Sequence, residues 1–246
     1  TLNGYIVEYG GFAGDPGIGS LSSSVVVATG TFTVTLVNDQ PVLGGTSTAA
    51  YTENGIPLAI APSATISDPD LPTGFNGGFL KAEITSNGTS PDQLTVITTG
   101  SFSVSGSSVS YSGTVIGTID STLNGINNSA LKISLNSNAT VAITQSLMRA
   151  IGYSNTSDDP STTTRTVTFT LNDGQNLGTG ASLERTATAT VSFTSINDNP
   201  TIGITASGTY SEGGLTPLQF LSGVTVSDPD GRDNLNGGSL REAFSS

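Results

Sequence analysis

The sequence predicts an all-β fold in which short antiparallel strands form two sheets packed face to face as a β-sandwich. Short runs of alternating apolar and polar residues follow one another, and Gly, Asn, Ser or Pro separates nearly every pair. Charged residues make up only 11% of the chain while β-branched residues are abundant, which argues against a disordered segment. Strands at this spacing are typical of sandwiches and barrels, and two stacked sheets are the usual way to bury them.

The motif Asn-Asp-Xaa-Pro occurs twice, at residues 38–41 and 197–200, which are 159 residues apart. In both copies a strand-like run precedes the motif, and a Glu, an Asp-Pro-Asp and an Asn-Gly-Gly follow it in the same order. We interpret this recurrence as a tandem array. Residues 1–40 would be the C-terminal strands of a preceding repeat, residues 41–199 a complete repeat, and residues 200–246 the N-terminal part of the next. We therefore expect the chain to be an excerpt of a longer protein.

The elements can be predicted in chain order from these alternations. Residues 31–37 read as a half-buried strand, with Phe32, Val34 and Leu36 on one face and Thr on the other. The complete repeat opens with a strand at residues 49–51 and a largely apolar stretch at residues 56–66. Further strands are predicted at residues 79–85, 94–98, 102–104, 109–111, 115–119, 131–135, 166–171 and 188–194. Residues 144–151 contain good helix formers, and we expect one or two helical turns there.

The composition excludes several classes of function. The chain has no Cys, His or Trp, which rules out thiol, zinc-finger and His-based catalytic chemistry. Its net charge of −12 has the wrong sign for a nucleic-acid or anionic-membrane binder and favours cations as partners. No apolar run is long enough to suggest a membrane span.

The acidic residues gather in turns, linkers and strand ends. In Asp68-Pro69-Asp70 the proline ring fixes its own φ and biases Asp68 toward an extended backbone, so that two carboxylates stand on a stiff loop. Bunched carboxylates repel one another unless a cation neutralises them. About six to eight oxygen ligands at irregular angles suit Ca²⁺ better than Mg²⁺, and the chain offers no soft ligand for a transition metal.

The order of these motifs is similar to that of the calcium-binding motifs in cadherin repeats. It runs through Glu53, residues 68–70, Asn76, residues 158–159, residues 172–174 and residues 197–200. Residues 152–160 followed by residues 165–174 resemble more specifically the tandem cadherin-like repeats of very large bacterial cell-surface and secreted proteins of the RTX-adhesin type. The resemblance covers the complete repeat and both fragments. It implies tandem Ig-like, cadherin-like β-sandwich repeats, Ca²⁺ at their junctions and an extracellular location.

The resemblance further implies a ligand set at each of two junctions. The upper junction would use Asn38, Asp39 and Gln40 of the linker with Asp68, Asp70, Asn76 and Asp173 of the complete repeat. The lower junction would use Glu53, Asp158 and Asp159 with Asn197, Asp198 and Asn199 of the linker and Asp228, Asp230 and Asn236 of the next repeat.

Two departures from the cadherin pattern reduce the expected number of ions. Cadherin linkers carry a further Asp two residues before the Asn-Asp, where this chain has Leu36 and Ser195. The repeat is also longer than a cadherin repeat, with the surplus between Thr85 and Thr144. We expect one or two ions at each junction instead of three.

Simpler interpretations compete with calcium at each motif. Asx side chains cap turns without any ion, Asn172-Asp173-Gly174 is also a hairpin signal, and Asp158 with Asp159 could form a solvated turn before Pro160. A glycosidase pair of Glu53 with Asp68 or Asp70 is disfavoured because the same residues recur in a second unit.

The sequence thus predicts a non-enzymatic structural segment, a calcium-stiffened rod, fibre or surface-layer element that supports adhesion. Its partners would be neighbouring repeats and other copies of the protein. The alternative function is a binding module for a polysaccharide or a protein, with its site in residues 85–144. Phe102 and Tyr111 are the aromatic residues of that region, and both alternate as core residues do. The incomplete ends could also reflect strand exchange between copies.

Overall fold

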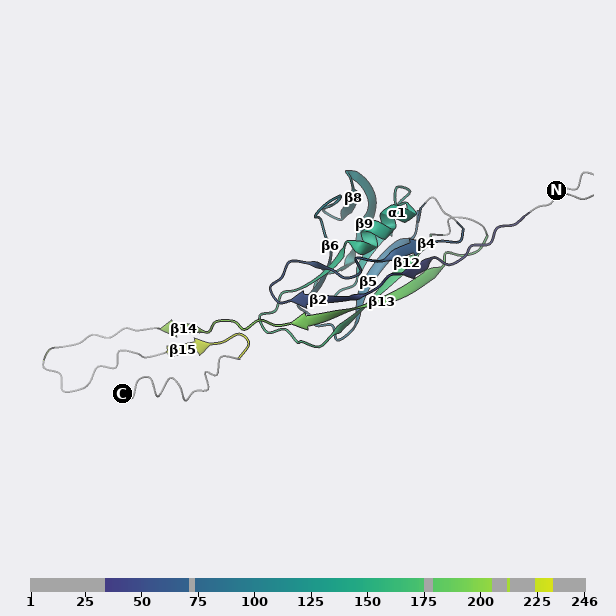
Figure 1. Cartoon of the computed structure of the whole chain (residues 1–246). Helices are drawn as coiled ribbons and strands as arrows, with labels where there is room; N and C mark the ends of the chain where they lie inside the picture. The colour runs from purple at the N-terminus through teal and green to yellow at the C-terminus, as the bar shows by residue number, and fades with distance from the viewer. Residues whose placement is uncertain (1–33, 71–73, 175–178, 205–211, 213–223, 232–246) are drawn as a thin grey trace, which may run out of the picture. The chain divides into compact units, whose positions relative to one another are not determined.

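A computed structural model of the chain describes residues 34–70, 74–174, 179–204, 212 and 224–231 (Figure 1). The chain divides into two compact units, Thr1–Val34 and Thr35–Ser246, and the account below concerns the second. Residues 31–33 of the strand expected at residues 31–37 lie outside the described residues. The half-buried strand is not formed in residues 34–37, where Val34 and Leu36 are exposed. In the described part, Val37 forms an isolated parallel bridge with Thr179.

Strands make up nearly all of the regular structure, which confirms the all-β class. They are β1 (Val42–Gly44), β2 (Thr48–Thr52), β3 (Leu58–Ala59), β4 (Thr65–Ser67), β5 (Phe79–Ser86), β6 (Asp92–Val96), β7 (Phe102–Ser105), β8 (Ser108–Tyr111), β9 (Thr114–Asn124), β10 (Leu131–Leu135), β11 (Ile151–Asn155), β12 (Arg165–Asn172), β13 (Glu184–Thr194), β14 (Thr201–Ile204) and β15 (Val224–Ser227). A single helix, α1 (Val141–Arg149), occurs in the described part of the chain.

Two sheets form the body of the fold. The larger has eight strands in the order β2-β13-β12-β5-β10-β9-β8-β7, and the smaller has three in the order β3-β11-β6. All neighbouring strands are antiparallel except β2 and β13, which run parallel with Thr48 opposite Thr190 and Thr52 opposite Thr194. Two further pairs, β1 with β4 and β14 with β15, each form a separate two-stranded sheet.

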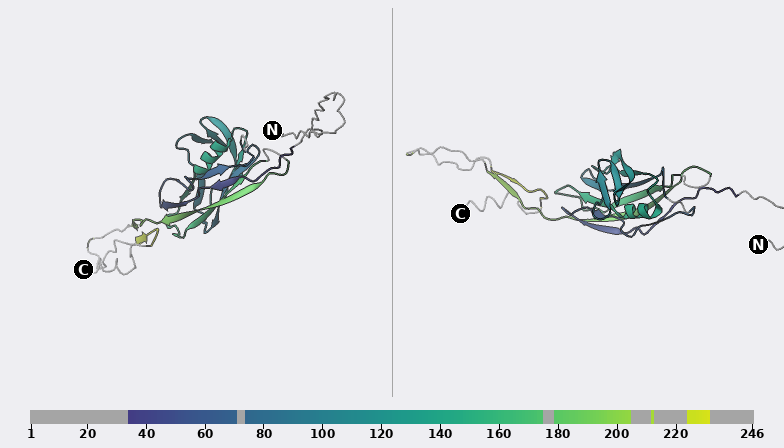
Figure 2. Two further views of the ribbon diagram at one scale, coloured as in Figure 1. Left: turned by 45° about the vertical axis from the view of Figure 1, so that its right-hand side comes forward. Right: turned by 90° about the horizontal axis from the view of Figure 1, so that it is seen from above.

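The core lies where the two sheets face each other (Figure 2). Along β12 the alternate residues Val167, Phe169 and Leu171 are fully buried, as period-two alternation predicts. Tyr51 of β2 meets Tyr153 of β11 across the core, with ring centroids 5.1 Å apart at an interplanar angle of 86°. This contact joins the two sheets, and the β-sandwich prediction is confirmed at this level.

The helix begins earlier than the sequence prediction placed it. We expected helix at residues 144–151, whereas α1 spans Val141–Arg149 and Ile151 already begins β11. Thr140 provides the missing start signal, because its side-chain oxygen accepts a hydrogen bond from the backbone N–H of Ile143 at 3.2 Å. The helix lies beside β4, where Arg149 Nε donates to the carbonyl oxygen of Ala64 at 2.7 Å (Figure 1). It is too short to cross a membrane, and the described residues contain no other helix that could.

Other differences concern short strands and the surplus region. Neither β1 nor β11 is predicted by the pattern of the sequence. The apolar stretch at residues 56–66 is divided into β3 and β4 by a turn in which Ala64 N–H donates to the Ala61 carbonyl at 3.0 Å. The surplus between Thr85 and Thr144 includes β7, β8 and β9, and these three strands extend the larger sheet beyond β10.

Candidate functional site

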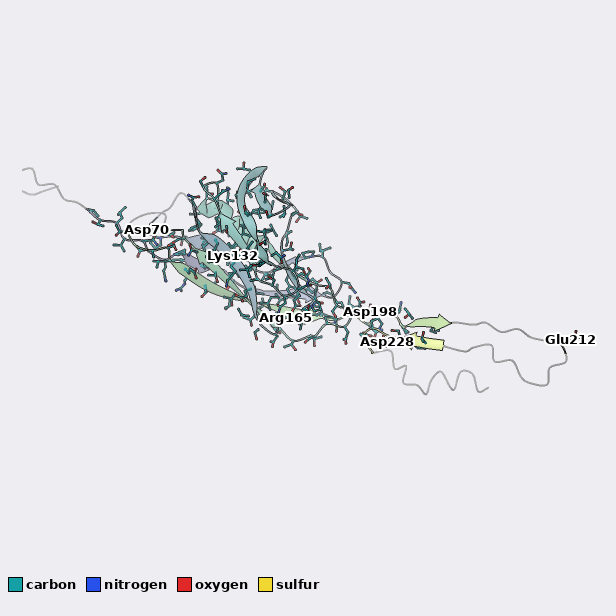
Figure 3. All side chains as sticks on the ribbon, turned by 180° about the vertical axis from the view of Figure 1, so that it is seen from behind. Asp70, Lys132, Arg165, Asp198, Glu212 and Asp228 are labelled. Carbon is teal, nitrogen blue, oxygen red and sulfur yellow. The ribbon has the colours of Figure 1, made fainter. Side chains whose placement is uncertain are left out.

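The predicted upper and lower ligands lie at opposite ends of the larger sheet. Asn172 at the end of β12 pairs with Glu184 at the start of β13, and Thr194 at the end of β13 lies beside Thr52. Asp173, directly after β12, therefore lies beside the start of β13. Glu53, directly after β2, lies beside the end of β13. Eleven residues of extended strand separate these ends by roughly 30 Å. Asp70 and Arg165 mark the two ends in Figure 3.

At the upper end, the strand pair β1–β4 brings the linker to the Asp-Pro-Asp loop. Val42 pairs with Ser67, so the residues before β1 continue alongside the residues after β4. Asp39 N–H donates to Asp70 Oδ2 at 2.7 Å, and Asp70 N–H donates to Asp68 Oδ1 at 3.0 Å. The loop is thus stiffened by its own carboxylates, as the proline between them suggested.

A second contact ties the linker to the loop after β12. Asn38 Nδ2 donates to Asp173 Oδ2 at 2.7 Å and to the Ala181 carbonyl at 3.1 Å. Asp173 Oδ1 accepts from Leu183 N–H at 2.9 Å, and the side chain is only 1% exposed. The connection between β12 and β13 spans residues 173–183, so the tight hairpin that Asn-Asp-Gly could have formed is not present. Asp173 instead anchors a longer loop.

Electrostatics at this end are repulsive. Burial raises the pKa of Asp68 above its ordinary value, and the nearby charges of Asp70, Asp173 and Asp39 raise it further against the lowering effect of the Asp70 backbone hydrogen bond. Four predicted ligands therefore share one electrostatic neighbourhood. Gln40 is exposed in the same linker and lines an open depression together with Asn38 and Asp39.

Asn76 reaches this end through its backbone. Gly174, which follows Asp173, has a φ of +71°, and a Cβ added there would stand 2.3 Å from the Asn76 carbonyl oxygen. The turn that contains Asn76 therefore packs directly against the Asp173 loop. The side chain of Asn76 itself is exposed.

Substitution of Gly174 by Ala is expected to destabilise the upper end strongly. The left-handed backbone alone costs about 1–2 kcal/mol in a non-Gly residue, and the clash with backbone at residue 76 adds to that cost. Gly113→Ala is a matched control, because Gly113 has a φ of +83° but nothing within 4 Å of its Cβ position. Urea unfolding of both variants would measure the difference, and equal losses would contradict the close packing of the two loops.

At the lower end, Glu53 stands out as a buried carboxylate. Its backbone N–H donates to the Thr194 carbonyl at 2.9 Å, and Glu53 Oε2 accepts from Ile196 N–H at 2.7 Å. The side chain is 2% exposed, and Oε1 is buried without a hydrogen-bond partner. A buried carboxylate oxygen without a hydrogen-bond partner destabilises the folded protein unless a cation or a donor reaches it.

Asp158 and Asp159 lie in the exposed loop after β11. The loop begins at Asn155, whose backbone N–H donates to the Tyr51 hydroxyl at 3.4 Å, and it is shaped by Ser157 N–H donating to Asn155 Oδ1 at 2.8 Å. Among the described contacts, none joins either Asp to Glu53. The structure places the loop at the same end of the sandwich without bringing the three carboxylates together.

The linker and the next strand pair repeat the upper arrangement. Thr201 pairs with Ser227 in the β14–β15 ladder, and these positions correspond to Val42 and Ser67 of the β1–β4 ladder. Continued three residues beyond each ladder, the register would set residue 198 opposite residue 230 and Asp39 opposite Asp70. Asp198 and Asp228 are labelled at this end of the strand pair in Figure 3. Asn197 and Asn199 precede β14 and are exposed, and Asn236 lies outside the described residues.

Sequence reasoning missed a buried polar network near the lower end. Asp92, Tyr153 and Arg165 are each fully buried. Tyr153 Oη donates to Asp92 Oδ1 at 2.5 Å, Asn155 Nδ2 donates to the same oxygen at 2.6 Å, and Arg165 Nε lies 3.4 Å from Asp92 Oδ2. Burial alone raises the pKa of Asp92, but the hydrogen bonds from Tyr153, Thr89 and Asn155 and the charge of Arg165 together bring it below its usual value.

One signal in the sequence could have revealed this network. Arg165 stands in phase with Val167, Phe169 and Leu171, so the alternation that points these residues inward also points the Arg inward. Its Nη1 donates to the carbonyl oxygens of Ser161 and Thr163, and its guanidinium lies 5.0 Å from the centre of the Phe193 ring. The network thereby fixes the end of the loop that carries Asp158 and Asp159.

The donor set suits a hard cation, although the side chains are not closed around one. Every charged ligand candidate is a carboxylate, and the upper carboxylates repel one another. Among the described residues, no three Asp or Glu side chains are arranged so that they could hold a metal ion as they stand. Comparison of the chain with protein-family models, curated proteins and solved structures gives no match.

Proposed function

We propose that this chain is a segment of tandem β-sandwich repeats in an extracellular bacterial surface protein, and that calcium stiffens the junctions between repeats. One observation carries the proposal: the strand pair that follows Asp39 and precedes Asp70 recurs in the same register between Asp198 and Asp230. A recurring acidic pair at a linker supports a role at junctions. A single catalytic or binding site would need no such recurrence.

The mechanism of such a junction is mechanical. The Asn-Asp linker is already tied to the sandwich by Asp70 and Asp173, so its path is set by carboxylates that also repel one another. Calcium, when bound, would neutralise these carboxylates and link them through oxygen coordination. Without that neutralisation, repulsion among Asp39, Asp68, Asp70 and Asp173 loosens the linker, and neighbouring repeats bend.

The strand pairing supports the finer, Ig-like and cadherin-like part of this proposal. The first long strand, β2, pairs in parallel with the last strand, β13, so the two ends of the complete repeat leave in opposite directions along one sheet. Repeats at residues 1–40, 41–199 and 200–246 would then join end to end as a rod, fibre or surface-layer element.

We also infer that the segment is not an enzyme. Glu53 lies at one end of the larger sheet and the Asp68–Asp70 loop at the other, separated by roughly 30 Å. Carboxylates that act on a glycosidic bond stand within about 10 Å of each other. The geometry therefore supports the non-enzymatic interpretation of these residues.

Small-angle scattering tests the rod directly. The full chain in calcium is expected to have a larger maximum dimension and a narrower distribution of distances than in EDTA, because the junctions straighten. Magnesium serves as the ionic control and is expected to give the EDTA result. The variant Asp39→Asn with Asp70→Asn should lose most of the calcium effect. A maximum dimension that does not change between calcium and EDTA would contradict the proposal.

A second candidate function, a binding module in residues 85–144, is favoured by a cavity there. The cavity holds about 560 Å³, and most of its lining comes from this region, with Val96, Ile97, Val104, Ile119 and Leu131 supplying an aliphatic wall. No aromatic ring lines it, although sugar sites use such rings. Phe102 is buried in the core and Tyr111 packs against it, as the sequence predicted. The cavity suits the apolar side chains of a protein partner better than a sugar.

A further inference from the structure

The outer border of the larger sheet is formed by β7, and its surroundings carry unusually little charge. Between Asp92 and Asp120 the sequence contains no charged residue, and this stretch includes β7 and β8. Asp92 itself is buried and paired with Arg165. In a chain with a net charge of −12, like-charge repulsion between two copies is therefore low at this strand.

The backbone of β7 is open on one side. In the β7–β8 ladder Ser105 pairs with Ser108 and Ser103 with Ser110, and Ser112 N–H donates to the Ser101 carbonyl at 2.7 Å. Alternate residues of an antiparallel ladder bond to the neighbouring strand, so the N–H and C=O groups of Phe102 and Val104 point away from β8. Since β7 is the last strand of its sheet, these groups face the open border.

The two borders of the smaller sheet, β6 and β3, differ from β7. The border of β6 is covered by the loop after β9, where Leu94 N–H donates to the Gly125 carbonyl and Asn128 N–H donates to the Asp92 carbonyl, both at 2.8 Å. The two-residue strand β3 directly follows Pro57, and proline is a common edge blocker. The strand β7 has neither a proline nor a charged residue.

Apolar surface lies beside this open strand, on the face to which Phe102 and Val104 belong. The aliphatic cavity that contains Val104 opens beside it, with Ile56 on the rim at 85% exposure. A second depression of about 440 Å³ adjoins the first through Ile97 and Thr99 and includes Phe102, Tyr111 and the charged residue Arg149. Val104 is itself 37% exposed. A strand added to β7 would cover these side chains while its backbone satisfied the open groups.

We propose that β7 is a self-association edge, at which β7 of a second copy pairs antiparallel and continues the sheet from one molecule into the next. A second copy is the occupant that the charge favours, because each copy brings the same uncharged strand and the same aliphatic cavity to the contact. Antiparallel pairing of identical strands is two-fold symmetric and therefore self-complementary. The inference deepens the second candidate function by naming its protein partner, and it rests on that function and not on calcium.

Sedimentation velocity on the full chain in EDTA, over a range of protein concentrations, tests the edge. Wild type is expected to show a reversible monomer–dimer equilibrium. Val104→Lys places an unpaired charge in the contact and should raise the dissociation constant at least about tenfold. Val104→Pro removes the outward N–H but leaves an apolar side chain, and it should weaken association to a similar extent. Ile202→Lys is the matched control, since Ile202 is 59% exposed on β14, and it should associate as wild type does.

Circular dichroism of each variant establishes that the fold is retained. A chain that stays monomeric at every concentration would overturn the inference, as would dimers that tolerate both substitutions at Val104. Dimers that form only with calcium and disappear in Asp39→Asn with Asp70→Asn would assign association to the junction. That result would overturn the proposed pairing of β7 with β7 and leave the calcium proposal intact. A maximum dimension that does not change with calcium in the scattering experiment would contradict the calcium proposal alone and leave the proposed pairing of β7 unaffected.

Discussion

Asp92→Ala is expected to lower the free energy of unfolding by about 3–5 kcal/mol, because it leaves the Arg165 guanidinium buried without its counter-charge. The loss also removes the acceptor for Tyr153 and Asn155, so three buried donors lose their partner together. Urea unfolding monitored by tyrosine fluorescence would measure the change.

Two further variants separate the charge from the packing. Asp92→Leu combined with Arg165→Met replaces the pair by apolar groups, and it is expected to cost much less than either single loss, because no charge is left alone. Asp120→Ala serves as the control, since Asp120 is only partly buried and also accepts several local hydrogen bonds, from Thr122 and Leu123. If the double variant were as unstable as Asp92→Ala, the buried charge would not be the cause.

The same network makes stability depend on pH in a defined direction. The pKa of Asp92 is lowered in the folded state, so its contribution is fully present above its unfolded pKa of about 3.8 and is lost as pH falls through the folded value. Burial and the Asp92 charge raise the pKa of Tyr153 above its ordinary value of 10.0, so that contribution is present below pH 10 and lost as pH rises beyond it. The contribution of Asp68 to stability changes with pH in the opposite direction to that of Asp92. Because the pKa of Asp68 is raised in the folded state, protonation of this group as pH falls favours folding.

Local alternation was sufficient to predict most strands. The stretches at residues 79–85, 131–135 and 166–171 match β5, β10 and β12 closely, because one face of each is buried and the other is polar. The strand β11 was missed because its residues Ile151 to Asn155 are buried on both faces at several positions, which erases the period of two. The order in which strands pair could not be predicted from local alternation either, since the extension of the larger sheet through β9, β8 and β7 depends on contacts between strands.

The candidate site was predicted in part for a related reason. The upper residues Asn38, Asp39, Asp70 and Asp173 are grouped as a ligand set that the resemblance to cadherin repeats implies. In the structure, hydrogen bonds join Asn38 to Asp173 and Asp39 to Asp70. The burial of Glu53 could not be foreseen, since a lone Glu after a short strand reads as a surface residue. Its position follows from the parallel pairing of β2 with β13, which no local pattern specifies.

Glu53→Gln is expected to remove the calcium-dependent stabilisation of the lower junction while leaving the chain at least as stable as wild type in EDTA. The amide keeps an acceptor for Ile196 N–H and eliminates the buried negative charge of which one oxygen has no partner. In calcium at about one hundred times its dissociation constant, wild type should gain about 2–3 kcal/mol from this junction, and the variant should not. Thermal unfolding in calcium and in EDTA gives both values.

Glu83→Gln is the matched control, because Glu83 pairs with Lys81 in the middle of β5 and lies away from both ends of the sheet. It should retain the full calcium effect. A Glu53→Gln variant that loses equal stability in calcium and in EDTA would show that Glu53 only caps the backbone of Ile196. A variant with the wild-type calcium effect would show that the cation is held elsewhere. Only a loss confined to calcium identifies the unpartnered oxygen as a ligand, because the hydrogen bond to Ile196 is common to both conditions.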